Sequence, residues 1–167
     1  MRLFLVLGCV ALLAGCAGYR LGPSNGLAAG ERSVQINPPV NSTLEPRLGE
    51  AVSHAMRKQI QRDGTYRLET RDPGDIIVTT TLVDYRRQGV AFEARDALTA
   101  RDYVIRVLAQ VSAHDRITGK NLFNREFNGR TTVRVGRDQT SSERQAYPLL
   151  AEDLARNVVA ALADGEW

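Results

Sequence analysis

The sequence lacks the residue patterns that mark most enzymes and metal proteins. It contains only two histidines, His54 and His114, and no pair of cysteines at zinc-ligand spacing. It also has no Gly-x-Gly-x-x-Gly turn, no Gly-Lys-Ser/Thr phosphate loop and no His-Glu-x-x-His pair. We therefore expect no catalytic residues, no metal and no cofactor, and the pattern favours a binding or assembly protein.

Long apolar runs are scarce as well, and the one that occurs lies at the start of the chain. Residues 3–13 are almost all apolar and follow a single positive charge, Arg2. A stretch of this length is too short to cross a hydrocarbon core of ~30 Å as a helix. A charged start, an apolar middle and small residues after it are typical of a secretory signal. No later run approaches the length of a membrane-spanning helix, so we expect none in the mature chain.

Cysteine is nearly absent, with Cys9 inside the leader and Cys16 directly after it. Leu13-Ala14-Gly15-Cys16 resembles a bacterial lipobox, in which the cysteine receives a diacylglyceryl group and becomes the mature N-terminus. The alternative is an ordinary signal peptide followed by an incidental cysteine. A lipidated Cys16 cannot form a disulfide, so packing alone must stabilise the fold.

The chain divides into four segments by composition and periodicity. We expect a lipoprotein signal peptide over residues 1–15, a lipidated cysteine with a glycine-rich flexible tether over 16–32, one α+β domain over 33–163 and a short tail over 164–167.

Two helices and several strands are predicted inside the domain. Apolar residues recur from Leu44 to Ile60 at helical spacing, with Ser42 and Glu45 as a capping box and Gly64 as the end. A second apolar stripe follows a start near Ser142, with Pro148 causing a kink or a later start. One set of residues is expected to be largely buried: Leu48, Val52, Ala55, Ile105, Val107, Val111, Leu154 and Val158.

Alternating patterns predict the strands. They cover residues 33–37, 66–70, 76–87, 103–113 and 123–135, with a loop over 88–99 and a bulge at Gly129. Helices and a sheet that are each apolar on one face can bury those faces only by packing against each other in two layers. The expected fold is a two-layer α+β sandwich, with both helices on one face of a mostly antiparallel sheet of four to five strands.

Charge is unevenly distributed along the chain. Residues 84–137 contain eleven Arg or Lys and six Asp or Glu, whereas the rest of the mature chain has ten basic and thirteen acidic residues. A basic middle third indicates an anionic partner, although arginines scattered over solvated strands would give the same counts.

Several short motifs together resemble the LPS-assembly lipoprotein family, LptE. Cys16 to Leu21 is similar to the family's Cys-Gly-Tyr-x-Leu start, with an inserted Ala17. Asn41-Ser42-Thr43, Arg62-Asp63-Gly64-Thr65, the Asp115–Gly119 hairpin and the final Leu-Ala-rich helix also match, in the family's order.

The resemblance implies a noncatalytic lipoprotein that plugs and helps assemble the outer-membrane barrel LptD and binds lipopolysaccharide. It implies lipid anchorage by Cys16 to the outer membrane, facing the periplasm. An exported lipoprotein seldom meets nucleic acid, so we expect no nucleic-acid partner. By position in the family pattern, Arg95 and Arg137 are the first candidates for contact with lipopolysaccharide. Arg101, Arg116, Lys120 and Arg130 are further candidates for that contact.

Two other functions stay open at this point. One is a lipoprotein component of another envelope machine, such as a secretion channel, which the identity of a co-purifying barrel would distinguish. The other is a lipid-anchored hydrolase. A cleft that contains titratable groups with shifted pKa values would favour it, whereas a flat, arginine-rimmed surface would count against it.

Overall fold

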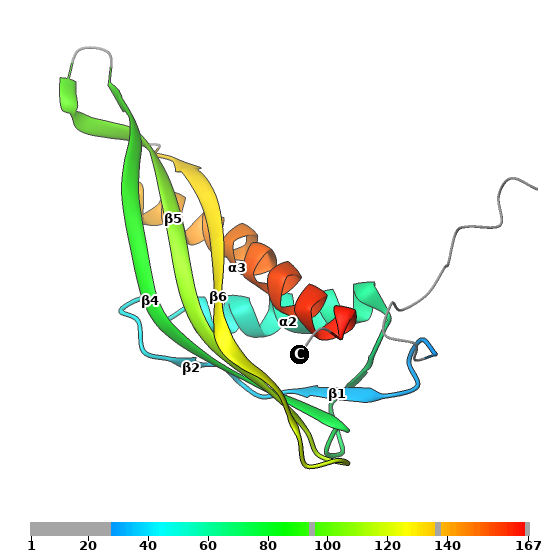
Figure 1. The fold of residues 1–167 in the computed structure, drawn as a ribbon. Helices are drawn as coiled ribbons and strands as arrows, with labels where there is room; N and C mark the ends of the chain where they lie inside the picture. The colour runs from blue at the N-terminus through cyan, green and yellow to red at the C-terminus, as the bar shows by residue number, and fades with distance from the viewer. Residues whose placement is uncertain (1–27, 94–95, 136–137, 166–167) are drawn as a thin grey trace, which may run out of the picture.

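The computed structural model describes residues 28–93, 96–135 and 138–165 (Figure 1). The expected signal peptide, Cys16 and most of the expected tether lie outside these residues. The elements, in chain order, are β1 (Ser33–Ile36), β2 (Val40–Asn41), α2 (Leu48–Asp63), β3 (Arg67–Glu69), β4 (Ile76–Glu93), β5 (Asp96–Asp115), β6 (Asn121–Arg134) and α3 (Gln139–Asp164). No helix among the described residues is long and apolar enough to cross a membrane.

The strands form one open sheet in the order β3-β1-β4-β5-β6, with β2 also paired to β4. Strands β4, β5 and β6 pair antiparallel over most of their length. Strands β1, β2 and β3 add short parallel pairings on the other side of β4. The mostly antiparallel α+β fold is confirmed, but the sheet has six strands rather than four to five, because β2 pairs separately after Pro38 and Pro39.

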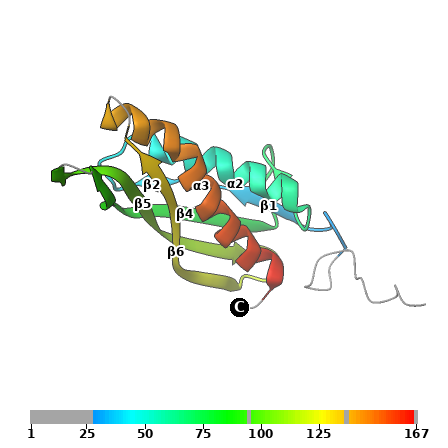
Figure 2. The same cartoon turned by 90° about the horizontal axis from the view of Figure 1, so that it is seen from above.

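Both helices cover the same face of the sheet, as the view from above shows (Figure 2). Helix α3 packs on β6 and along α2, which itself lies over the β1–β3 side. All eight residues predicted for the core are buried. The alternation along β5 therefore places Ile105, Val107 and Val111 under the helices and leaves the even-numbered residues on a helix-free face.

Helix α2 begins later than predicted. Its first residue is Leu48, and no side chain caps its start at Arg47. Instead, Asn41 accepts from the Thr43 amide at 3.1 Å and donates to the Glu45 carbonyl at 2.9 Å, which closes a turn ahead of the helix. Leu44, predicted on the apolar stripe, is 98% exposed. The capping-box interpretation was wrong because both of its partners bond elsewhere. The Ser42 amide donates to the Leu82 carbonyl at 3.0 Å, and the Glu45 carboxylate accepts from the Tyr147 hydroxyl at 2.6 Å.

Two other predicted boundaries also need correction. The loop expected over residues 88–99 is largely strand, because β4 continues to Glu93 and β5 starts at Asp96, so the hairpin projects beyond the helices (Figure 1). Helix α3 begins at Gln139, where Asp138 accepts from the Thr140 and Ser141 amides, and it continues through Pro148.

Gly129 does not form the predicted bulge. It pairs in regular register with Val107. A Cβ atom there would lie 2.7 Å from the Leu150 carbonyl oxygen and 2.8 Å from the Leu154 Cβ. The glycine therefore allows α3 to approach β6 closely.

The predicted turn between β5 and β6 is confirmed and is organised by Asp115. Its buried carboxylate accepts from the Ile117 and Thr118 amides at 2.9 and 3.1 Å and lies 2.9 Å from Arg32. Burial acts to raise the pKa of Asp115, but these hydrogen bonds outweigh it and lower the pKa to about 2.

Asp115→Asn is expected to lower the free energy of unfolding by about 1–3 kcal/mol at pH 7, because Arg32 loses its partner. A pKa below the unfolded value gives stability that is present above pH ~4 and lost as the pH falls towards 2. Urea unfolding at pH 7 and pH 2.5 should show the difference between the two proteins shrink at the lower pH. An equal difference at both pH values would contradict this role.

Candidate functional site

Three arginines form a row across the helix-free face of the sheet. Arg86 on β4 pairs with Arg106 on β5, and Arg106 pairs with Arg130 on β6. Residues directly opposite each other on neighbouring strands have Cβ atoms roughly 4.5–5.5 Å apart, and like charges at this spacing destabilise a sheet. We call Arg86, Arg106 and Arg130 the arginine ladder.

All three side chains of the arginine ladder are exposed. Arg106 lies between buried Ile105 and Val107, so it points away from the helices. The Arg130 amide donates to the Asp153 carboxylate of α3 at 2.9 Å and so faces away from β5. Arg106 and Arg130 thus form a non-hydrogen-bonded pair, the type in which side chains lie closer.

Among the described residues, one member of the arginine ladder has a carboxylate partner. Arg86 lies 2.5 Å from Asp84 on its own strand. Within the described part of the chain, no carboxylate is within ion-pair distance of the Arg106 or Arg130 guanidinium groups. The arginine ladder therefore presents unbalanced positive charge to solvent, which suits an anionic partner.

Two basic residues near the arginine ladder share one carboxylate. Arg134 and Arg101 both pair with Asp102, at 3.0 and 3.4 Å. The hydrogen bond from Arg134 is the largest influence that lowers the pKa of Asp102, so this carboxylate stays ionised. Arg106 and Arg130 differ from these two arginines because no carboxylate among the described residues lies within ion-pair distance of them.

Apolar surface adjoins the arginine ladder. A shallow cavity of about 430 Å³ is lined by its three arginines together with Asp84, Leu108 and Asn128. Val83, at the register shift after Leu82 of β4, is 47% exposed, and Val40 of the adjacent β2 is 56% exposed. Cationic and apolar groups together can contact an amphipathic anion.

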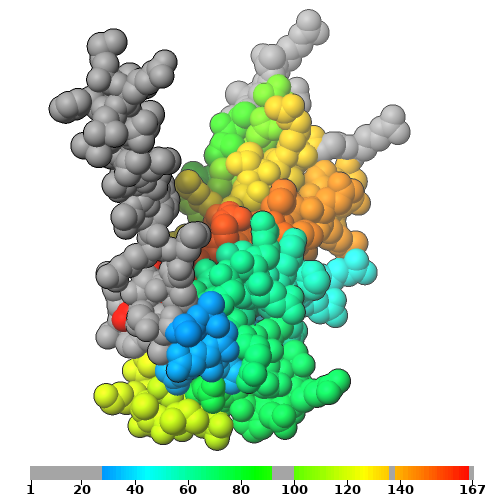
Figure 3. All heavy atoms as spheres, turned by 90° about the vertical axis from the view of Figure 1, so that its right-hand side faces the viewer, coloured from blue at the N-terminus to red at the C-terminus, as the bar shows by residue number. Residues whose placement is uncertain are grey.

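The structure separates the predicted lipopolysaccharide contacts. Arg130 belongs to the arginine ladder, whereas Arg101 is paired with Asp102. Arg116 and Lys120 lie in the β5–β6 turn, at the end of the molecule away from the start of α3 (Figure 3). There Arg116 donates to the Gly74 carbonyl at 3.1 Å. Arg95 and Arg137 lie outside the described residues.

Sequence reasoning missed Arg86 and Arg106 as individual candidates. Both contributed to the count of basic residues, but only strand register aligns them with Arg130. Alternation placed Arg106 on the exposed face of β5. A register between strands was the missing information.

The chain is a two-layer α+β domain whose helix-free sheet face carries exposed arginines. The same fold occurs in a Xanthomonas campestris protein at 8% identity, with a TM-score of 0.60 and coverage of 87% of this chain and 91% of that chain. It also occurs in a protein described as a lipoprotein from Caulobacter crescentus, at 14% identity, TM-score 0.53, and coverage of 77% and 87%. A Chlamydia trachomatis protein matches at 13% identity, TM-score 0.57, and coverage of 81% and 96%.

The family itself is identified from the sequence. The model of the lipopolysaccharide-assembly family LptE matches residues 31–162, and the chain belongs to this family. Comparison with curated proteins gives no match. The resemblance to the family is therefore confirmed over residues 31–162, whereas the Cys16–Leu21 motif lies outside the matched residues.

Proposed function

We propose that this chain is an outer-membrane lipoprotein that binds lipopolysaccharide on the helix-free face of its sheet during lipopolysaccharide assembly. Cys16 carries the lipid, the glycine-rich segment after it is the tether, and the domain faces the periplasm. Family membership and the Leu-Ala-Gly-Cys leader support this placement. The domain acts inside an LptD-type barrel as a noncatalytic plug.

The arginine ladder is the observation that carries this proposal. Arg106 and Arg130 are adjacent, exposed and without carboxylate partners among the described residues. Arginine pairs with phosphate through two parallel hydrogen bonds, and adjacent arginines suit a densely phosphorylated headgroup. Leu108 lines the same cavity and provides apolar surface for the first methylenes of acyl chains, and exposed Val83 directly precedes Asp84 of that cavity.

Titration of the full chain in detergent with lipid A tests the proposal. Binding should weaken strongly between about 50 and 500 mM salt, because exposed charges are screened over ~10 Å at 0.1 M ionic strength and less at higher salt. A neutral glycolipid with the same acyl chains should bind at least tenfold more weakly. Equal binding of both lipids, or binding unaffected by salt, would contradict recognition by the arginine ladder.

The barrel partner needs a separate measurement. Affinity purification of the chain from detergent-solubilised outer membrane should recover an LptD-type barrel. Recovery of the channel of another envelope machine instead would overturn the plug role while leaving lipid A binding to be judged by the titration.

A further inference from the structure

Two turns lie side by side at one end of the molecule. They are the β3–β4 turn, residues 70–75, and the β5–β6 turn, residues 116–120 (Figure 1, Figure 3). The Arg116 amide donates to the Asp75 carbonyl at 2.8 Å, and the Arg116 guanidinium donates to the Gly74 carbonyl at 3.1 Å. The two turns therefore present one surface, which we call the turn pair.

Hydrogen bonds at the base of the turn pair hold both turns in place. The Asp115 carboxylate accepts from the Ile117 and Thr118 amides, as described above. The Asp75 carboxylate accepts from the amide and the hydroxyl of Ser33 at 2.8 and 2.9 Å. These bonds from Ser33 hold the pKa of Asp75 below its usual value. The side chains at the tips of the turns are thus presented to solvent by a fixed backbone.

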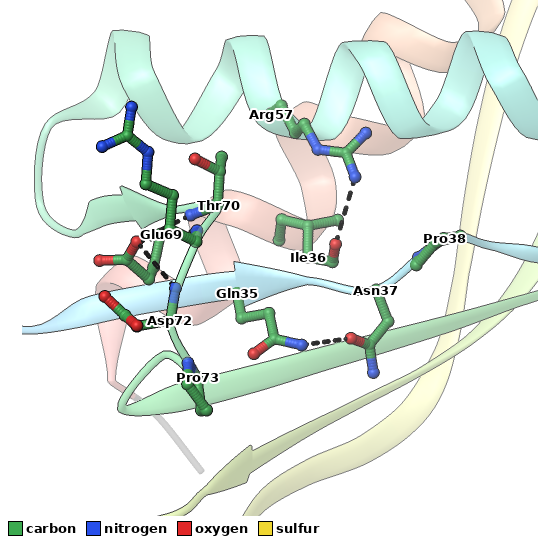
Figure 4. A pocket seen from close by; sticks show the side chains of 10 residues that line it. Gln35, Ile36, Asn37, Pro38, Arg57, Glu69, Thr70, Asp72 and Pro73 are labelled. Atoms are coloured by element: carbon green, nitrogen blue, oxygen red, sulfur yellow. Dashed lines mark hydrogen bonds between the residues drawn. The ribbon is translucent and has the colours of Figure 1, made fainter.

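The tips carry apolar and basic side chains together. Ile117 is 64% exposed, and Pro73 is exposed on the side of its turn that lies away from α2 (Figure 4). Arg71, Arg116 and Lys120 are exposed beside them. Within the described ranges, no carboxylate is within ion-pair distance of these three basic groups.

Most acidic residues around the turn pair already have partners. Asp115 is buried and pairs with Arg32 at 2.9 Å. Glu69 accepts from the three amides that follow it, at 3.0 to 3.4 Å (Figure 4). Asp75 is bonded to Ser33, so the exposed acidic residue of the two turns is Asp72. Three exposed basic residues against one acidic residue give the turn pair a local positive charge.

The described part of the chain begins at this same end. Figure 3 shows its first residues, in blue, beside the β5–β6 turn, in yellow, and Arg32 pairs with Asp115 there. Cys16, the proposed lipid site, precedes Ala28 by twelve residues, which can span at most about 40 Å. Strand β5 has 20 residues and is roughly 65 Å long. The tether is thus shorter than the sheet, which keeps the turn pair at the end nearer the lipid.

We propose that the turn pair contacts the membrane surface directly, with the exposed Ile117 side chain among the phospholipid headgroups. Arg71, Arg116 and Lys120 pair with headgroup phosphates. Contacts of this kind gain from buried apolar area and from attraction to anionic lipid. The contact rests on the proposed anchorage by Cys16 and concerns the lipoprotein before a barrel partner binds it. Held at two points, the sheet directs its β4–β5 hairpin away from the membrane.

Quenching of a tryptophan by brominated lipid tests the proposal on the full lipidated chain, in vesicles of phosphatidylethanolamine and phosphatidylglycerol. Trp167 is the single tryptophan, so Trp167→Phe provides the background for Ile117→Trp. We expect quenching at least threefold stronger at position 117 than for Leu149→Trp, a residue that is 58% exposed on α3. Arg71→Glu with Lys120→Glu should reduce quenching at position 117 to the level at position 149, because attraction to phosphatidylglycerol becomes repulsion.

Arg47→Glu with Arg144→Glu is the matched control, because it makes the same charge change at exposed positions at the starts of α2 and α3. It should leave the quenching unaltered. Retention of the chain on the vesicles after a carbonate wash reports the lipid anchor separately. On a retained chain, quenching no stronger at position 117 than at position 149, or equal losses in the two double variants, would overturn the contact and leave the anchor standing. A chain that carbonate removes would overturn the anchor, and the contact with it.

Discussion

Replacing both Arg106 and Arg130 by glutamate is expected to weaken lipid A binding about a hundredfold or more. A hydrogen bond to a charged group contributes about 1.5–3 kcal/mol, and tenfold in affinity corresponds to about 1.4 kcal/mol. The two residues are directly paired, so their effects are expected to be coupled rather than strictly additive. Calorimetric titration of lipid A into the single and double variants measures both the loss and the coupling.

A single substitution in the arginine ladder can separate an effect on lipid A affinity from an effect on folding stability. Arg106→Gln removes one of three adjacent like charges, so it should keep or slightly raise the thermal midpoint while weakening lipid A binding. Arg144→Glu is the matched control for Arg106→Glu, because Arg144 is an exposed residue on α3, in the helical layer. An affinity loss in Arg144→Glu equal to that in Arg106→Glu would show that only net charge matters and not the arginine ladder.

Gly129→Val is expected to destabilise the domain by about 3 kcal/mol or more. The added Cβ would lie 2.7 Å from the Leu150 carbonyl and 2.9 Å from the Leu154 amide nitrogen, so the backbone of α3 must move. Overpacking of this kind typically costs about 1–3 kcal/mol, and here the obstacle is backbone rather than a flexible side chain. Urea unfolding should show a lower midpoint.

Gly49→Ala is the matched control for this prediction. Its Cβ would make only ordinary contacts, 3.6 Å from the Asn41 Cβ, and alanine favours a helix over glycine by about 1 kcal/mol. The midpoint should therefore rise. An unchanged midpoint in Gly129→Val would contradict the close packing of α3 on β6.

The sequence predicted the parts of the fold that depend on burial within one element. Alternation along β5 identified Ile105, Val107 and Val111 as buried, and the stripe on α3 identified Leu154 and Val158. It did not predict where strands end, because the β4–β5 hairpin continues by backbone pairing past Arg87 to Glu93, with register shifts that break the alternation. The bulge predicted at Gly129 was wrong because the glycine instead makes room for Leu150 and Leu154 of α3, which lie far along the chain.

The candidate site shows the same limit. The excess of basic residues covers the third of the chain that contains the arginine ladder, but the ladder depends on the register of three strands, which local patterns do not give. Arg130 was among the predicted contacts, whereas Arg101 proved to be paired with Asp102. Arg95, Arg137 and the lipidation of Cys16 stay predictions.

Site-specific photocrosslinking in cells most directly tests the claim that the helix-free face binds lipopolysaccharide. A photoreactive residue at position 108, where Leu108 lines the cavity beside the arginine ladder, should crosslink to lipopolysaccharide. The same group in place of Leu149, which is 58% exposed on α3, should not. Lipopolysaccharide on an immunoblot at position 108 alone is the result we predict. No crosslink at position 108, or an equal one at position 149, would contradict the account.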